Sequence, residues 1–173
     1  MVLTIAPLVL LACLGGPPAA PPGPGGPPQD SSREAQSEHV KRGAAHFNRA
    51  FYELTPRKRD LEASHELDLA VAAFEAGLRA GPSADAHRYL GRICALRQQF
   101  RDAARHYDSL ADLDRADVDA CVLAALAWAE AGELASARER LLEAKGRTTD
   151  PGALSRLDDY LAKLDGRGPV PLP

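Results

Sequence analysis

The sequence predicts an all-α protein: an α-solenoid of antiparallel helix pairs with a capping helix at its C-terminal end. Apolar residues recur at spacings of three and four from residue 39 onward, as on the buried face of a helix. The pattern repeats after 34 residues, which indicates stacked copies of one helical unit. Only three of the 14 prolines lie between residues 39 and 165, so long helices fit this stretch better than a β-protein with many turns.

The length of 173 residues and the formal net charge of −3 fit one modest domain with tails. Basic and acidic residues alternate along the chain, whereas a nucleic-acid partner would require a basic face. The Arg-Lys-Arg run at residues 57–59 is interpreted either as a solvated helix start or as a contact to phosphate or lipid head groups. No nucleic-acid partner is expected.

Residues 1–12 are predicted to be a signal peptide. The apolar run at residues 2–14 is too short to span a bilayer as a helix but has the length of a signal-peptide core. The sequence Leu-Leu-Ala-Cys that ends at Cys13 resembles the lipobox of bacterial lipoproteins. This resemblance implies that the thiol of Cys13 is lipidated and that the chain is anchored to a membrane of the bacterial envelope, facing the periplasm.

Two other interpretations of this end of the chain stay open. Leu11 stands where lipoproteins more often have a small residue, and no Lys or Arg precedes the apolar core. An ordinary signal peptidase would release a soluble periplasmic or secreted protein. Alternatively, Cys13 is a plain apolar residue.

Residues 13–37 are expected to be a tether. Residues 16–28 consist only of Pro, Gly and Ala, which have little to bury and alternate stiff pieces with glycine joints. Such a spacer after a lipidated cysteine would hold a domain off a membrane surface. A role as a ligand for an aromatic-lined groove is the other interpretation. Residues 166–173 are again rich in Pro and Gly and are expected to be a flexible tail.

Between these tails we expect a helical domain over residues 38–165. Two apolar stripes predict helices over roughly 38–54 and 57–80. Thr55 followed by Pro56 is interpreted as the end of the first helix and the start of the second. The sequence Gly-Pro-Ser that ends at Ser83 closes the second helix and caps a third in the same way.

The 34-residue period is the strongest signal in the sequence. A shift by 33 in the other direction places residues 100–110 on residues 67–77, so a third copy survives in its second half. The positions 34 apart pair like with like or apolar with apolar: His87 with Cys121, Leu90 with Ala124, Gly91 with Ala125, Cys94 with Trp128, Phe100 with Leu134, Ala103 with Ala137, Tyr107 with Leu141, and Leu110 with Ala144.

These positions resemble the tetratricopeptide repeat family over about residues 51–151. The small residue early in the first helix corresponds to Gly91 or Ala125, and the turn glycine corresponds to Gly132. The small residue of the second helix corresponds to Ala103 and Ala137. The resemblance implies about three helix-pair units and a protein-binding scaffold. The long segment before Ser64 does not match, so helix 38–54 is interpreted as an enlarged or inserted version of the family's first helix.

A final helix is expected to start at Asp150 and Pro151, with one leucine stripe and a charged opposite face. Such a helix covers the open end of a solenoid. The stripe consists of Leu154, Leu157, Leu161 and Leu164 among Arg156, Asp158, Asp159 and Lys163.

By the same resemblance, the first helices line a groove for a protein partner. Two arginines beside an apolar strip would suit an extended peptide with a carboxylate and aliphatic side chains. The alternative is that these are solvated residues on a helix surface. The expected groove residues are Asp85, Arg88, Arg92, Leu96, Asp119, Val122, Leu126 and Glu130.

No enzymatic activity, cofactor, metal site or small-molecule substrate is expected. His65 and Glu66 begin like a zinc-protease motif, but the second histidine is absent. His39 and His46 are expected at the surface. The three cysteines have no zinc-binding spacing.

Cys94 and Cys121 are interpreted as buried apolar residues or as a disulfide between neighbouring repeats.

The sequence thus predicts an exported, membrane-anchored interaction scaffold. The alternative is a soluble periplasmic protein with a structural or self-associating role.

Overall fold

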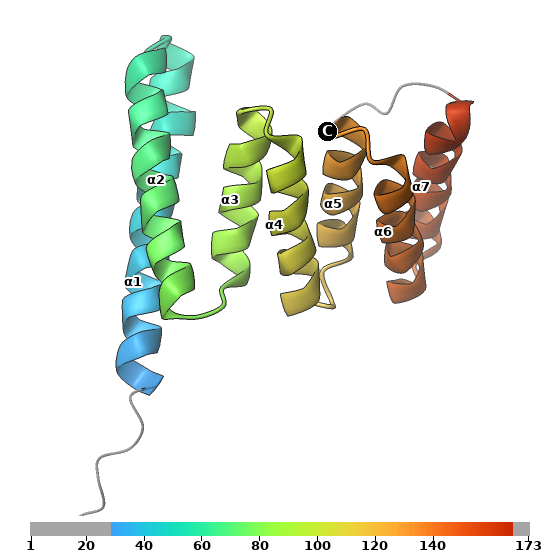
Figure 1. The fold of residues 1–173 in the computed structure, drawn as a ribbon, viewed down its shortest axis with the longest axis horizontal. Coiled ribbons are helices and arrows are strands. Elements are labelled where there is room, and N and C mark those ends of the chain that lie inside the picture. The colour runs from blue at the N-terminus through green and yellow to red at the C-terminus, as the bar shows by residue number, and fades with distance from the viewer. Residues whose placement is uncertain (1–28, 168–173) are drawn as a thin grey trace, which may run out of the picture.

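The computed structural model describes residues 29–167, and within them the chain is helical throughout apart from short connections (Figure 1). The α-helices are α1 (Gln29–Asn48), α2 (Asp60–Ala80), α3 (Ala84–Leu96), α4 (Phe100–Leu113), α5 (Val118–Glu130), α6 (Leu134–Arg147) and α7 (Pro151–Ala162). Short segments follow α1 and α7: the π-helical η1 (Arg49–Leu54), the 3-10 helix η2 (Thr55–Arg57) and the π-helical η3 (Lys163–Arg167).

The helices form a row of antiparallel pairs, α1 with α2, α3 with α4 and α5 with α6, and α7 follows at the end of the row (Figure 1). Each helix from α3 to α6 packs mainly on its neighbours in the sequence. This architecture confirms the predicted all-α repeat of helix pairs. In such a row each unit contacts only the units beside it.

Each pair closes through a small residue on the first helix and a large residue on the second. A Cβ atom on Gly91 would lie 2.6 Å from the ring of Tyr107, which is closer than real Cβ atoms approach. A Cβ atom on Gly43 would lie 2.7 Å from the ring of Phe74 in the same way. Gly43 therefore has in the first pair the role of Gly91 in the second, and α1 is the first helix of the first unit.

The first unit is longer than the others at the turn that joins its helices. The small and large residues are 31 positions apart in Gly43 and Phe74, against 16 in Gly91 and Tyr107. The additional 15 residues lengthen both helices around η1 and η2, and Figure 1 shows α1 and α2 rising beyond the remaining pairs. The expectation of an enlarged first helix is confirmed, and the enlargement also involves the second helix.

The boundaries expected for the first two helices are wrong at their starts. Helix α1 begins at Gln29, so residues 29–37 of the expected tether are helical. The amide nitrogen of the Gln36 side chain donates to the carbonyl oxygen of Pro82 at 2.8 Å, and this contact to the end of α2 holds the early turns of α1 in place. Such a long-range contact is not visible in the local sequence pattern.

The expected cap at Thr55 and Pro56 is also wrong. These residues lie in η2, and α2 begins only at Asp60. The Thr55 hydroxyl donates to the carbonyl oxygen of Ala50 at 2.9 Å, so it closes the helix before it. The chain then turns at Lys58, whose φ of 56° is left-handed.

Other capping predictions are confirmed. The hydroxyl of Ser83 accepts a hydrogen bond from the amide of Ala86 at 3.2 Å and starts α3. The carboxylate of Asp150 accepts from the amide of Ala153 at 2.7 Å, and Pro151 is the first residue of α7. Leu157 is the buried residue of the predicted leucine stripe, and α7 ends the row as the expected capping helix.

Most repeat positions predicted from the 34-residue period are core positions. Both cysteines in the described residues are free, so the disulfide interpretation is wrong; Cys121 is buried and Cys94 half-buried. An exception to the apolar pattern is Leu134, which is 52% exposed. The repeat residues buried in both copies are Leu90 and Ala124, Gly91 and Ala125, Ala103 and Ala137, Tyr107 and Leu141, and Leu110 and Ala144.

The predicted signal peptide, Cys13 and residues 16–28 lie outside the described residues, as does most of the expected tail, residues 168–173. The first two residues of that tail, Gly166 and Arg167, belong to η3. Over residues 29–167, no helix combines the length and the apolar character that crossing a membrane requires.

Candidate partner-binding groove

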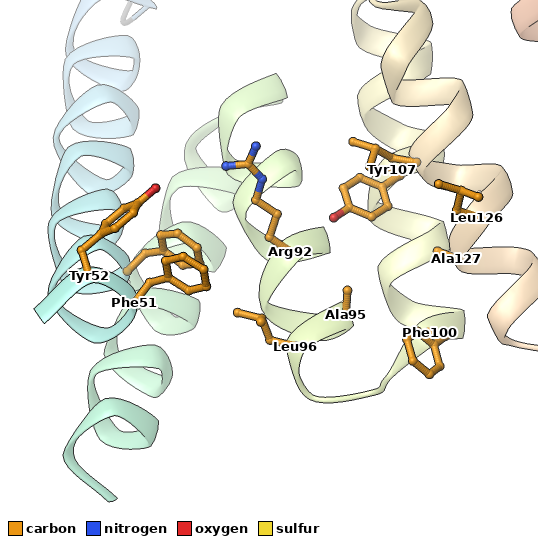
Figure 2. A pocket seen from close by; sticks show the side chains of 11 residues that line it. Phe51, Tyr52, Arg92, Ala95, Leu96, Phe100, Tyr107, Leu126 and Ala127 are labelled. Carbon is orange, nitrogen blue, oxygen red and sulfur yellow. The ribbon is translucent and has the colours of Figure 1, made fainter. Parts of the chain in front are cut away.

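A cavity of about 570 Å³ opens on the face formed by the first helices of the three pairs. We call it the groove. Its lining is mainly aromatic and aliphatic, with one arginine (Figure 2). The lining residues are Phe47, Phe51 and Tyr52 from α1 and η1, Arg92, Ala95 and Leu96 from α3, Phe100 and Tyr107 from α4, and Leu123, Leu126 and Ala127 from α5.

The enlarged first unit supplies one wall of the groove. Phe51 and Tyr52 lie in η1 and are 40% and 67% exposed, which is unusual for large rings. Phe51 stacks on the buried ring of Phe47 with 5.7 Å between centroids, and its other neighbour, Tyr52, meets it edge-on at 5.1 Å. The stack fixes the position of this wall while leaving its outer surface open to a ligand.

A buried carboxylate fixes η1 to α2. Glu66 is 7% exposed and accepts from the ring of His46 at 2.7 Å and from Arg49 at 3.0 Å. The hydrogen bond from His46 is the largest cause that lowers the pKa of Glu66, and the charge of Arg49 lowers it further. His46, expected at the surface, is thus half-buried in this contact. Because Arg49 belongs to η1, the ion pair positions the segment that carries the aromatic wall.

The opposite side of the groove is formed by α3, α4 and α5. Leu96 is 51% exposed and faces the cavity from the end of α3. Figure 2 shows the guanidinium of Arg92 above it and the hydroxyl of Tyr107 pointing toward the same space. Burial raises the pKa of Tyr107 to about 12, so its phenol keeps its proton and can donate a hydrogen bond at neutral pH.

Three of the eight predicted groove residues line this cavity: Arg92, Leu96 and Leu126. The two predicted arginines do not act together there, because Arg88 is ion-paired with Asp117 at 2.6 Å, between α3 and the turn before α5. The remaining predicted residues lie outside the cavity lining, namely Asp85, Asp119 and Glu130, which are exposed, and Val122, which is half-buried.

Sequence reasoning missed the aromatic wall. Phe47 and Phe51 were assigned to one buried stripe, but the structure buries Phe47 and leaves Phe51 partly open. The available signal was the unmatched length of the first unit, because inserted residues in a repeat protein extend one edge of the stack.

A second hollow of about 260 Å³ lies on the other side of this wall, between α1, α2 and the end of α3. Phe51 and Leu96 line both hollows and therefore form the partition between them. Arg97 borders the second hollow and is ion-paired with Asp68 of α2 at 2.6 Å. Only the first hollow therefore offers an exposed aromatic wall beside an arginine without an ion pair at this distance.

Within residues 29–167 no three His, Cys, Asp or Glu side chains lie close enough to hold a metal ion. The described part of the groove is therefore suited to binding an apolar segment through burial, with Arg92 available for a carboxylate.

No family model and no curated protein matches this chain. Among solved structures it is similar to MamA D159K mutant 1, at 18% sequence identity and a TM-score of 0.47. That likeness covers 80% of this chain and 88% of the other. The helix-pair fold is established by this chain's own geometry.

Proposed function

We propose that this protein is an interaction scaffold whose groove binds an extended segment of a partner protein. The observation that carries the proposal is the groove itself: an open cavity of about 570 Å³ with Phe51, Tyr52 and Leu96 exposed around it. Exposed apolar side chains that gather around one concavity are typical of interaction sites. The resemblance to tetratricopeptide repeats supports a protein partner.

The groove favours a segment with aliphatic or proline side chains and one carboxylate. Phe51, Leu96 and Leu126 offer the apolar surface, and Arg92 offers a two-point contact to a carboxylate. Arg88 is not part of this recognition, because Asp117 already occupies its guanidinium.

The groove is tested by Leu96→Glu, compared with Leu134→Glu as a matched control. Leu96 and Leu134 are 51% and 52% exposed, but only Leu96 lines the groove. We expect Leu96→Glu to reduce the capture of partner proteins from a native lysate at least tenfold, since it places a charge in the apolar cavity. Capture should be unchanged by Leu134→Glu. Equal capture by both variants would exclude this groove as the binding site.

We further propose that the protein is exported and anchored in the bacterial envelope through Cys13. The support is the apolar run at residues 2–14, the Leu-Leu-Ala-Cys sequence and the Pro/Gly-rich stretch behind it. A labelled fatty acid should be incorporated into the protein but not into a Cys13→Ser variant. Incorporation into both would contradict lipidation, and ordinary export to the periplasm would then be the alternative.

A structural role with self-association is the second candidate. It is favoured by the exposed leucines outside the groove, Leu61, Leu134 and Leu142, which are 90%, 52% and 49% exposed. Light scattering over a range of protein concentrations separates the two, because a self-associating protein increases in mass with concentration while a monomeric scaffold does not.

A further inference from the structure

We infer that residues 168–173, Gly-Pro-Val-Pro-Leu-Pro, bind in the groove of their own chain and that a partner segment has to displace them. This inference rests on the proposed function, because it names the occupant of the same groove in the absence of a partner. Four sets of observations carry it: where the described chain ends, how far the six residues reach, what they consist of, and what the groove offers them.

The described chain ends beside the groove. Leu164 of η3 and Tyr160 of α7 line a small hollow together with Leu126 of α5. Leu126 also lines the groove, so one side chain separates η3 from the cavity. Gly166 has a φ of 97°, a left-handed conformation that ends a helix and redirects the chain. Residue 168 thus follows a turn that lies next to the α5 side of the groove.

The end of η3 also lies at the correct level along the helices. Figure 1 shows α3, α5 and α7 running in the same direction, so their C-terminal ends share one edge of the row. Leu96 is the last residue of α3, and Leu126 lies in the last turns of α5. The groove is therefore at the edge where the chain leaves α7.

Six residues are long enough to cross the groove. An extended chain covers about 3.3 Å per residue, which gives about 20 Å for residues 168–173. Packed helices lie about 8–10 Å apart, so two helix spacings from α5 over α3 to α1 also amount to about 20 Å. A segment that starts beside Leu126 can reach the rings of Phe51 and Tyr52.

The composition of the segment matches the lining. Its prolines favour an extended polyproline conformation, which has no internal hydrogen bonds and packs its rings on aromatic side chains. Val170 and Leu172 supply further apolar surface. The donors of Arg92 and of the Tyr107 phenol can serve backbone carbonyl oxygens of such a segment.

The segment itself carries no charged side chain, so it leaves the charge of Arg92 unpaired. A partner segment with a carboxylate gains that pairing, which the chain's own residues do not offer. The groove thus discriminates between its resting occupant and a partner by one charge.

The other proline-rich stretch, residues 16–28, is the weaker candidate. It precedes Gln29, which lies 22 residues before Phe51 along one continuous helical stretch. At about 1.5 Å per residue this distance is about 33 Å, so these residues start at the far end of α1.

Intramolecular binding has a measurable consequence. A short flexible connection gives an effective concentration in the millimolar range. If the free hexapeptide binds with a Kd of about 0.1 mM, the attached segment occupies the groove about ten to one. Added peptide then binds to the intact protein about tenfold more weakly than to a variant whose own segment is disabled.

The experiment uses the full chain and a fluorescent peptide of the sequence Gly-Pro-Val-Pro-Leu-Pro. We expect the Leu172→Asp variant to bind the peptide about tenfold more tightly than the unmodified protein. Adding Leu96→Glu to that variant should remove the binding, whereas adding Leu134→Glu should leave it unchanged. Equal affinities for the unmodified protein and Leu172→Asp, or binding that survives Leu96→Glu, would overturn the inference.

An NMR measurement identifies the source of the occupant. In a mixture of isotope-labelled and unlabelled full chains, contacts between the Leu172 methyl groups and the Tyr52 ring should be found within one molecule. Contacts that arise only between two molecules show a second copy as the occupant, and contacts to prolines of residues 16–28 show the other stretch. Either result contradicts the inference.

Partner capture keeps this inference separate from the proposed function. Leu172→Asp should capture more partner than the unmodified protein, because the groove is vacant. If capture depends on Leu96 but the two peptide affinities are equal, the proposed function holds and the inference fails. If the affinities differ tenfold but capture does not depend on Leu96, the segment occupies the groove and the proposed function fails.

Discussion

At the level of single residues, the approach of the helices in each pair depends on a missing side chain. Gly91 lies against the ring of Tyr107, and Gly43 lies against the ring of Phe74. Both rings are buried, so neither can swing into solvent to make room for an added methyl group. The two pairs therefore set how closely the helices of the first two units pack.

Gly91→Ala is expected to destabilise the protein by about 1–2 kcal/mol. Overpacking against Tyr107 costs about 1–3 kcal/mol, and the better helix propensity of alanine offsets up to about 1 kcal/mol of it. Gly146→Ala is the control, since a Cβ atom there meets nothing within 4 Å. Urea unfolding measures both changes. A Gly91→Ala protein as stable as the Gly146→Ala protein would show that the contact is not tight.

Gln98→Gly is expected to stabilise the protein by about 0.5–1 kcal/mol. Gln98 turns the chain between α3 and α4 with a φ of 60°, and Gly132 has the equivalent place 34 residues later with a φ of 81°. A left-handed conformation costs a residue with a side chain about 1–2 kcal/mol, and the added freedom of glycine in the unfolded chain returns about 0.4–1 kcal/mol of the gain. Thermal unfolding should show a higher Tm for Gln98→Gly and a lower one for Gly132→Ala. A lower Tm for Gln98→Gly would contradict the argument.

Between elements, polar contacts set the register of neighbouring helices. Trp128 of α5 donates to the carboxylate of Asp108 on α4 at 3.1 Å, and Arg140 of α6 pairs with the same carboxylate at 2.8 Å. Burial is the largest cause that raises the pKa of Asp108, although both neighbours favour its charged form. One carboxylate thus connects three consecutive helices.

A pair of histidines makes the contact between α3 and α4 sensitive to pH. The Nδ1 atoms of His87 and His106 are 3.1 Å apart, so one ring donates to the other only while at least one is neutral. Burial lowers the pKa of both, and the charge of His106 lowers that of His87 further. Asp102 and Glu75 act in the opposite direction on His106 without reversing the shift.

The sign of the effect follows from proton linkage. The folded protein binds protons on these rings less readily than the unfolded chain does, so stability is retained above the ordinary histidine pKa of 6.5 and decreases as the pH falls below it. We expect the free energy of unfolding to decrease between pH 7.5 and pH 5. The decrease should be smaller in His87→Asn, and an unchanged pH dependence in that variant would exclude the pair as its source.

For the whole molecule, stability should be distributed unevenly along the row. Each unit packs only on its neighbours, and α7 packs on the rest of the row mainly through α6. The end that carries α7 therefore depends on few residues, of which Leu157 is the most buried in α7.

Leu157→Ala is expected to cost about 2–5 kcal/mol in this local packing. Hydrogen exchange should accelerate in α6 and α7, while α1 and α2 should exchange as before. Leu154→Ala, at a half-buried position of the same stripe, should have a smaller effect. Equal acceleration in all helices would show that the row unfolds as one cooperative unit instead.

Much of this fold could be predicted from local patterns. The period of 34 identified the second and third units, because paired residues such as Ala103 and Ala137 have equivalent core positions. Ser83 and Asp150 identified helix starts because a cap is a contact between residues three apart. The start of α1 was missed because Gln36 is held by Pro82, far away in the sequence.

The groove was predicted only in part for the same reason. Arg92, Leu96 and Leu126 followed from their positions in the repeat. The ion pair between Arg88 and Asp117 depends on how two units lie against each other, which no spacing within one unit reveals.

The sequence by itself determined the helix-pair repeat, its period and most of its core, because these depend on periodicity and on contacts between near neighbours. Only the tertiary structure decided where the row has its binding surface. The 15 additional residues of the first unit place Phe51 and Tyr52 opposite Leu96, although about 45 positions separate them in the sequence. Such a surface arises from the stacking of complete units, and each helix taken alone shows only an apolar face.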